Sequence, residues 1–430
     1  PARPAAVTGP VVPVNAAVLA CPAPVNARVG ALAGPAGGGQ AVVADLKSGR
    51  ALATLGTPGV TWSATPAART VGGAVVIRAG GGLAGGFAAE QTTRTRKYLA
   101  GVRCAEPQID HWFLGPGPGA ATVDLLVTNV DDVAASVDVT ALSNDGSLDT
   151  TDGRGLEVAP RSTRTIKVGR SADGLGVLAA QSETVALHVS VTTGRVAAAV
   201  REDLGGKGVD WVPVTTAPAT RVVLPGIPGG NGSRTLMVGV PGETDAHVKV
   251  QVITASGAFA PEGQDTIEAP ATTVSTADLE GGLSGKAGAV LLTSDQPIVA
   301  GFVATGDDVS FGAATLPLTG GGGSADARDG SSLVLTAPQA AARVRVTPVT
   351  AQGAGTPADV EVGAGRTLEV PQSQDGVLIQ PLPGSGPVHA ARVMLAKAGD
   401  DRLVTVLPIV SSPGTVRLPP VLDSLGFLLP

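Results

Sequence analysis

Pro297-Ile-Val-Ala-Gly-Phe-Val303 decides the fold of this chain, because related stretches occur three more times along it. The relatives are Gly82-Leu-Ala-Gly-Gly-Phe-Ala88, Arg195-Val-Ala-Ala-Ala-Val-Arg201 and Pro387-Val-His-Ala-Ala-Arg-Val393. Successive copies begin 113, 102 and 90 residues apart. Recurrence at nearly regular spacing indicates a structural unit that is repeated along the chain.

The length of the chain agrees with four such units. A chain of 430 residues is too long for one hydrophobic core, and units of roughly 100 residues match the commonest domain size. We predict an extended N-terminal segment, four β repeats, and a terminal strand with a tail. Their predicted boundaries are 1–14, 15–104, 105–210, 211–318, 319–414 and 415–430.

Each repeat has the pattern of short β-strands separated by turns. Val137-Asp-Val-Thr140 and Val185-Ala-Leu-His-Val-Ser-Val191 alternate apolar and polar residues, which is typical of half-buried strands. Asn144-Asp-Gly146 is a strong turn signal. About seven strands per 100 residues predict an all-β protein of four tandem Ig-like β-sandwich repeats. The alternative is a β-propeller closed by the C-terminal strand, Thr415-Val-Arg-Leu-Pro-Pro420, so a rod and a ring both remain open.

The composition argues against several kinds of partner. Aromatic residues make up only 2 % of the chain, so platforms on which bases could stack are scarce. The net charge of −6 does not attract nucleic acid, and we expect no nucleic-acid partner. The longest apolar runs are far shorter than the ~20 residues of a membrane span, so we expect no transmembrane segment. Pro1-Ala-Arg-Pro-Ala-Ala6 is typical of the start of a processed, exported chain.

The two cysteines also fit export. Both fall in the first repeat, and a disulfide between Cys21 and Cys104 would close a loop of 84 residues. Structural disulfides persist mainly in oxidising compartments outside the cytoplasm. We therefore predict this disulfide and an extracytoplasmic location, with two separate buried thiols as the alternative.

A further set of residues carries a resemblance to a known family. It comprises Leu126-Val-Thr-Asn129, Ser143-Asn-Asp-Gly146, Val158-Ala-Pro-Arg-Ser162, the stretch from Arg195 to Asp203, and Val209-Asp-Trp-Val-Pro213, together with His111-Trp-Phe-Leu-Gly115. In these motifs, most of the chain from Cys21 to Leu418 resembles a family of uncharacterised exported proteins from high-GC actinobacteria. The resemblance implies a cell-envelope role, because the family is encoded near envelope glycosyltransferases, and the family has no established activity to carry over.

Few patterns in the sequence indicate a catalytic, cofactor or metal-binding site. The histidines, His111, His188, His247 and His389, are scattered over different repeats, and no pair has metal-ligand spacing. Nucleophile-elbow, zinc-protease and phosphate-loop motifs are absent from the sequence. We predict no catalytic residue, no cofactor and no metal site. The alternative is a glycan-active enzyme that pairs Glu202 or Asp203 with Asp210, which requires both carboxylates to face one cleft.

The rare aromatic residues are the best candidates for an interaction surface. His111, Trp112 and Phe113 lie near the start of the second repeat, and Asp210 and Trp211 lie at its end. Tryptophan often dominates the binding energy of interfaces. The simpler alternative is that both groups are buried between neighbouring repeats and lock them together.

These observations favour a non-enzymatic extracytoplasmic scaffold or binding protein of the cell envelope. Its expected partners are an envelope protein or a cell-wall glycan. The family resemblance adds a membrane glycosyltransferase as a partner, of which this chain would be an accessory subunit.

Overall fold

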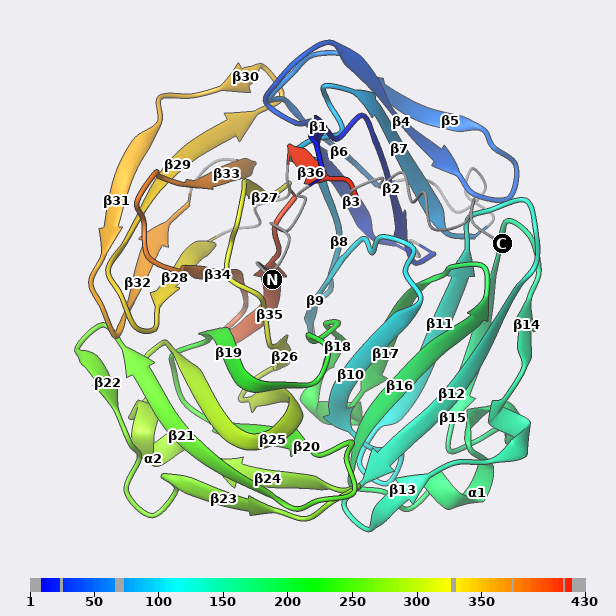
Figure 1. Ribbon diagram of the computed structural model, residues 1–430, viewed down its shortest axis with the longest axis vertical. Helices are drawn as coiled ribbons and strands as arrows, with labels where there is room; N and C mark the ends of the chain where they lie inside the picture. The colour runs from blue at the N-terminus through cyan, green and yellow to red at the C-terminus, as the bar shows by residue number, and fades with distance from the viewer. Residues whose placement is uncertain are drawn as a thin grey trace, which may run out of the picture.

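A computed structural model describes residues 9–23, 26–65, 73–325, 330–372, 375–412 and 414–419. Within them the chain is almost entirely β, and it forms four sandwiches of two antiparallel sheets each (Figure 1). The predicted tandem β-sandwich fold is therefore confirmed. The propeller alternative is not, because each unit contains two packed sheets where a propeller blade has one.

The main strands of the two sheets correspond in all four units, and units 2, 3 and 4 add one further strand, β14, β23 and β31. In unit 2 the first sheet has the order β10-β16-β12-β13, and the second has the order β15-β11-β17-β18. The other units repeat both orders. The first sheets are β2-β7-β4-β5, β19-β25-β21-β22 and β27-β33-β29-β30, and the second sheets are β6-β3-β8-β9, β24-β20-β25-β26 and β32-β28-β34-β35.

The elements of units 1 and 2 follow in chain order. Unit 1 contains β2 (Ala16–Cys21), β3 (Arg28–Leu32), β4 (Gly39–Asp45), β5 (Ala51–Leu55), β6 (Thr61–Ala64), β7 (Val75–Gly81), β8 (Ala88–Arg94) and β9 (Leu99–Arg103). Unit 2 contains β10 (Asp110–Pro116), β11 (Thr122–Asn129), β12 (Ala135–Ser143), β13 (Gly146–Leu148), β14 (Leu156–Val158), β15 (Ser162–Val168), β16 (Thr184–Thr193), β17 (Ala197–Asp203) and β18 (Val209–Val212). Its short helices are η1 (Thr151–Gly153), η2 (Ala172–Gly174), α1 (Gly176–Ala179) and η3 (Gly205–Lys207).

Units 3 and 4 continue the series. Unit 3 contains β19 (Ala219–Ile227), β20 (Ser233–Gly239), β21 (Ala246–Thr254), β22 (Gly257–Phe259), β23 (Thr266–Ala269), β24 (Val274–Asp278), α2 (Glu280–Leu283), β25 (Gly288–Thr305) and β26 (Val309–Ala313). Unit 4 contains β27 (Gly322–Ser324), β28 (Ser332–Ala337), β29 (Ala342–Thr350), β30 (Gly353–Ala354), β31 (Ala358–Val362), β32 (Arg366–Pro371), β33 (Gly376–Pro381), β34 (His389–Ala398) and β35 (Asp401–Ile409).

The period-2 pattern explains how each sandwich buries its core. In β12, Val137 and Val139 are fully buried, whereas Asp138 between them is only partly covered. The alternating strand β16 likewise buries Val185, Leu187 and Val189. Two sheets that face each other with such apolar sides form the core of a sandwich.

The four units form a ring, and the last strand of each unit lies at its centre. Strands β9, β18, β26 and β35 pack side by side around a common axis, each against the next. The chain ends meet as well, because β1 (Val11–Pro13) pairs with β36 (Thr415–Arg417) in antiparallel register (Figure 1). The terminal strand therefore returns to the start of the chain, which answers the question of rod or ring.

One predicted boundary between repeats differs from the structure. The segments around Trp211 and Phe311 form the central strands β18 and β26. The predicted boundary between residues 210 and 211 therefore falls inside β18. Strand β25 includes Ser294, Asp295 and Gln296, and it runs unbroken from one sheet of unit 3 into the other.

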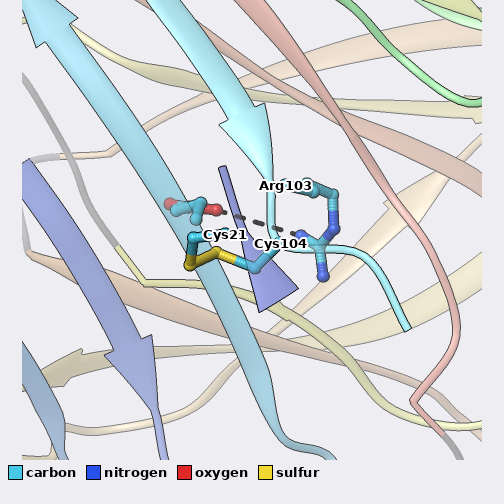
Figure 2. The surroundings of a disulfide bond; sticks show 4 residues. Cys21, Arg103 and Cys104 are labelled. Carbon is cyan, nitrogen blue, oxygen red and sulfur yellow. Dashed lines mark ion pairs between the residues drawn. A yellow bond between two sulfur atoms is a disulfide. The ribbon is translucent and has the colours of Figure 1, made fainter. Parts of the chain in front are cut away.

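The predicted disulfide is present, and it spans unit 1. Cys21 ends β2 in the first sheet, Cys104 follows β9 in the second sheet, and the two sulfurs are bonded (Figure 2). Both cysteines are buried in the core of unit 1. The disulfide thus fixes a central strand of the ring to the first strand of its own unit.

The junction between units 4 and 1 is polar as well as apolar. Glu90 on β8 accepts hydrogen bonds from the Ser324 hydroxyl at 2.7 Å and from the Ala325 amide at 2.9 Å. The fully buried guanidinium of Arg392 donates to the same Ser324 hydroxyl at 3.0 Å and to Ser331 at 3.1 Å. This network joins the first and last units across the point where the ring closes.

Candidate functional site

The residues predicted to form an interaction surface are all buried. His111, Trp112 and Phe113 lie on β10, and Asp210 and Trp211 lie on β18. None of the five is more than 7 % exposed. The prediction of an exposed surface at these residues is therefore wrong, and the alternative, burial between neighbouring units, is what the structure shows.

The aromatic group on β10 is held by local contacts in unit 2 and packs toward unit 3. The His111 ring lies 2.9 Å from the Val196 carbonyl oxygen through Nε2, and burial lowers its pKa. The Trp112 ring stacks on His188 at a centroid distance of 4.1 Å. Phe113 belongs to a core that also contains Phe311 of unit 3. These side chains fix the geometry of the junction between units 2 and 3.

Trp211 has the corresponding role between units 1 and 2. It packs in an apolar cluster with Ala100 and Val102 of β9 and with Ala199 of β17. Its neighbour Asp210 points the other way, because successive side chains of a strand face opposite sides. Trp211 therefore faces the interface between units 1 and 2, and Asp210 faces the ring axis.

Asp210 and Asp308 bring two carboxyl groups into the ring centre. Asp210 accepts hydrogen bonds from the Gly101 amide of unit 1 at 2.8 Å and from the Thr405 hydroxyl of unit 4 at 2.9 Å. Asp308, which directly precedes β26, accepts from the Leu99 amide of unit 1 at 2.8 Å and from the Val404 amide of unit 4 at 3.2 Å. Carboxyls from units 2 and 3 therefore bind donors from units 1 and 4.

The surroundings of these two groups favour the neutral carboxylic acid. Burial raises the pKa of Asp210 well above its usual range, and the nearby Asp308 raises it further. Burial also raises the pKa of Asp308 to about 6, although the amides that donate to it act in the opposite direction. Desolvation dominates in both cases because the carboxylate loses its hydration.

The carboxylate pair of the enzyme hypothesis is also buried. Glu202 and Asp210 are direct cross-strand partners on β17 and β18. Glu202 is 1 % exposed and lies against Gly115, where a Cβ atom would come within 2.2 Å of its Oε1 atom. Its Oε2 atom has no hydrogen-bond partner among the described residues, and burial raises its pKa. The two residues are therefore neighbours across two strands, but their carboxyls lie in the interior and not along an open cleft.

The described residues offer neither a cluster of metal ligands nor a membrane-spanning helix. No group of three or more His, Cys, Asp or Glu side chains in this part of the chain is arranged to hold a metal ion. No helix formed by the described residues is long and apolar enough to cross a membrane.

A groove lies between units 2 and 3 and has a volume of about 260 Å³. Thr184, Thr235 and Thr305 line it, together with the charged Glu183 and Lys207. The buried Oγ1 atom of Thr184 has no partner among the described residues. These groups could hydrogen-bond a small polar ligand.

The linkers between units share one geometry. In each unit, an amide just after the central strand donates to a carbonyl in the first strand or, in unit 4, directly before it. These bonds are Ala105 to Ala20 at 2.9 Å, Thr215 to Trp112 at 2.9 Å, Thr315 to Val223 at 3.0 Å and Ser412 to Gly321 at 2.7 Å. Because the central strands are equivalent around one axis, all four linkers leave the ring on the same face.

That face collects exposed apolar side chains. The described residues include eleven large hydrophobic side chains that are exposed, and seven of them lie on the linkers or on the terminal strands that continue the fourth linker. We call these seven the linker face: Val11, Ile109, Val214, Leu316, Val410, Val416 and Leu418. Ile109 and Leu316 are 65 % and 71 % exposed. The sequence analysis missed this surface, because its residues are far apart in the chain and follow no periodic pattern.

Comparison with known proteins identifies a family but no activity. The model of a family of unknown function, DUF5719, matches residues 60–373. No curated protein matches the chain.

Two solved structures show weak similarity to the chain. An anti-sigma factor domain-containing protein from Clostridium clariflavum has 9 % identity and a TM-score of 0.14, with 89 % of this chain and 99 % of that chain covered. A tetra-tandem repeat from the extending region of a large adhesion protein has 15 % identity and a TM-score of 0.11, with 92 % of each chain covered. TM-scores this low carry no argument about fold or function.

Proposed function

This chain belongs to the DUF5719 family, whose function is unknown, and we propose that it is a non-enzymatic scaffold or binding protein of the cell envelope. The linker face is the observation that carries the proposal. Exposed apolar side chains that gather on one face of a folded protein are typical of a protein–protein contact site. The ring holds them in fixed relative positions, as a scaffold requires.

An extracytoplasmic location is part of this proposal. The buried disulfide between Cys21 and Cys104 supports it, since structural disulfides are rare in the reducing cytoplasm. The partner that best suits an aliphatic surface is an envelope protein. A membrane glycosyltransferase is the specific candidate, suggested by the family resemblance, and this chain would then be its accessory subunit.

A cell-wall glycan is the second candidate partner, and the groove between units 2 and 3 favours it. Threonine hydroxyls and opposite charges can hydrogen-bond the hydroxyls of a sugar. None of the described residues that line the groove is aromatic, so no ring is offered there on which a sugar could stack, and this proposal ranks below the protein partner.

Affinity purification from native envelope tests the proposal. The tagged chain is compared with a linker-face variant, Ile109→Ser with Leu316→Ser and Val410→Ser. A matched control, Val133→Ser with Val177→Ser and Leu178→Ser, removes three exposed apolar side chains elsewhere on the surface. We expect a stoichiometric protein partner with the wild type and the control, and at least tenfold less of it with the linker-face variant.

Equal recovery of the partner with both variants would contradict a role for the linker face. Recovery of glycan alone, abolished by Thr184→Val with Thr235→Val, would move the binding site to the groove. Recovery of a membrane glycosyltransferase would identify the chain as an accessory subunit.

A further inference from the structure

We propose that Asp210 and Asp308 form a pH-sensitive clasp at the ring axis, which holds units 2 and 3 against units 1 and 4 more tightly in acid than at neutral pH. The two carboxyls are contributed by units 2 and 3. The four groups of units 1 and 4 that donate to them are the Leu99, Gly101 and Val404 amides and the Thr405 hydroxyl. The clasp therefore joins one half of the ring to the other.

The clasp reaches across the axis and does not only link neighbours. Around the axis, β18 packs against β9 and β26, and β35 packs against β26 and β9. Asp210 on β18 binds Thr405 on β35, the strand diagonally opposite. Asp308, at the start of β26, binds Leu99 on β9, which is also diagonally opposite. Two side chains thus connect both diagonals of the ring.

Packing at the axis leaves no room for these carboxyls to reach water by a small shift. Asp210 is 0 % and Asp308 is 1 % exposed. Gly208 of unit 2 lies so close that a Cβ atom on it would come within 2.3 Å of the Asp308 Oδ1 atom. A Cβ atom on Gly101 would come within 2.9 Å of the Thr405 Oγ1 atom. Opening the clasp therefore requires the units to separate.

The charged groups around the axis do not compensate two ionised carboxylates. Asp308 acts on Asp210 with a like charge, and Glu202, the cross-strand partner of Asp210, is a third acid. On the β35 side, the Arg402 guanidinium donates to the Gly229 carbonyl, and the Arg402 amide donates to Asp307. On β9, the Arg103 guanidinium donates to the Gly323 carbonyl and lies near Glu90. Within the described residues, no cation thus binds either carboxyl of the clasp.

The direction of the pH effect follows from this environment. The closed ring favours protonated carboxyls, whose pKa lies above the value in an open, hydrated state. The stabilisation by each group is complete below its open-state pKa near 4, and it is lost as the pH rises through the closed-state value. For Asp308 that loss occurs between about pH 4 and pH 6. Neutral pH then leaves the ring closed but easier to open.

Hydrogen–deuterium exchange of the amides at the axis measures the opening directly. After correction for intrinsic exchange, we expect the opening equilibrium at Leu99 and Val404 to rise by up to about 100-fold between pH 4 and pH 7, since each pKa unit is worth a factor of ten. Asp308→Asn keeps the shape and cannot ionise, so most of this pH dependence should disappear. Asp307→Asn, one residue away and exposed, is the matched control and should retain it.

His389 titrates in an overlapping range at the junction of units 3 and 4, and comparison of the two variants cancels its contribution. A carbon-13 titration of the Asp308 carboxyl in the wild type gives a second readout that needs no variant. The proposal predicts a midpoint near pH 6. A midpoint below about 4.5, or the same pH dependence of exchange in Asp308→Asn and wild type, would overturn it.

Discussion

The carboxyl of Asp308 accepts a hydrogen bond of 2.8 Å from the amide of Leu99, which lies 209 positions earlier in the chain. The bond joins the third unit to the first across the centre of the ring. Contacts between residues so far apart in the sequence distinguish this architecture from a string of independent domains. In a linear array each unit contacts only its neighbours in sequence. Here units 1 and 3, and units 2 and 4, also meet at the axis.

Gly208→Ala should destabilise the fold by about 2–4 kcal/mol. Gly208 has φ 119° and ψ −179°, a conformation nearly exclusive to glycine, and its added Cβ would collide with Asp308. Chemical denaturation measures the free energy of unfolding. Gly206→Ala, two residues away with open space around it, should change that energy by less than 1 kcal/mol. Equal effects of the two substitutions would contradict the packing described at the axis.

Loss of the disulfide should cost about 4–5 kcal/mol, because it closes a loop of 84 residues in the unfolded chain. The free energy of unfolding of the double variant, Cys21→Ala with Cys104→Ala, should equal that of the reduced wild type. Chemical denaturation of the wild type with and without reductant, and of the variant, measures this. Since Cys104 begins the linker to unit 2, protease sensitivity should increase first at residues 104–109. An unchanged midpoint of denaturation after reduction would show that the packing of β2 and β9 holds unit 1 without the disulfide.

Arg392→Met should destabilise the ring by about 2–4 kcal/mol. The substitution removes charged hydrogen bonds to Ser324 and Ser331 and leaves buried polar atoms without a partner at the junction of units 4 and 1. Arg345→Met is the matched control, because Arg345 forms an exposed ion pair with Asp359 and should have little effect. A larger effect of Arg345→Met than of Arg392→Met would contradict the importance of the buried network.

His389 should weaken the fold in acid. Its Nδ1 atom lies 2.9 Å from the Thr315 hydroxyl, and burial lowers the pKa of the imidazole to about 4. A lowered pKa means that the neutral imidazole stabilises the folded state, and this stabilisation is lost as the pH falls from about 6.5 through 4. Up to about 3 kcal/mol should disappear over that range. His389→Gln should remove this part of the acid sensitivity in denaturation experiments at pH 7 and pH 4, and an unaltered pH profile would refute the assignment.

The repeats and the sandwich fold could be predicted from the sequence because both depend on local patterns. Alternating residues such as those of Val137-Asp-Val-Thr140 specify a half-buried strand wherever they occur. Cys21 and Cys104, the two cysteines of the chain, suggested a single disulfide, and it is present. The strands could be predicted without knowing where the distant units lie.

The arrangement around the axis could not be predicted in the same way. Asp308 follows Asp307, and a pair of aspartates reads as a solvated turn until the neighbouring units are placed. One signal was available, because Gly208-Val-Asp-Trp211 and Asp308-Val-Ser-Phe311 are similar and both contain aspartate. The aromatic residues were misjudged for the same reason. Tryptophan is rare in this chain, but the rarity of a residue type does not reveal whether Trp112 or Trp211 faces solvent or another unit.

Closure of the ring is the central claim, and a cross-link between the chain ends tests it most directly. Val12 on β1 and Val416 on β36 are paired residues, so Val12→Cys with Val416→Cys should form a disulfide under mild oxidation. The control, Val12→Cys with Val133→Cys, places the second thiol on the surface of unit 2 and should not cross-link. A linked peptide that contains residues 12 and 416, detected by mass spectrometry, is the predicted result. Failure of the Val12–Val416 pair to cross-link, or equal cross-linking in the control, would contradict a closed ring.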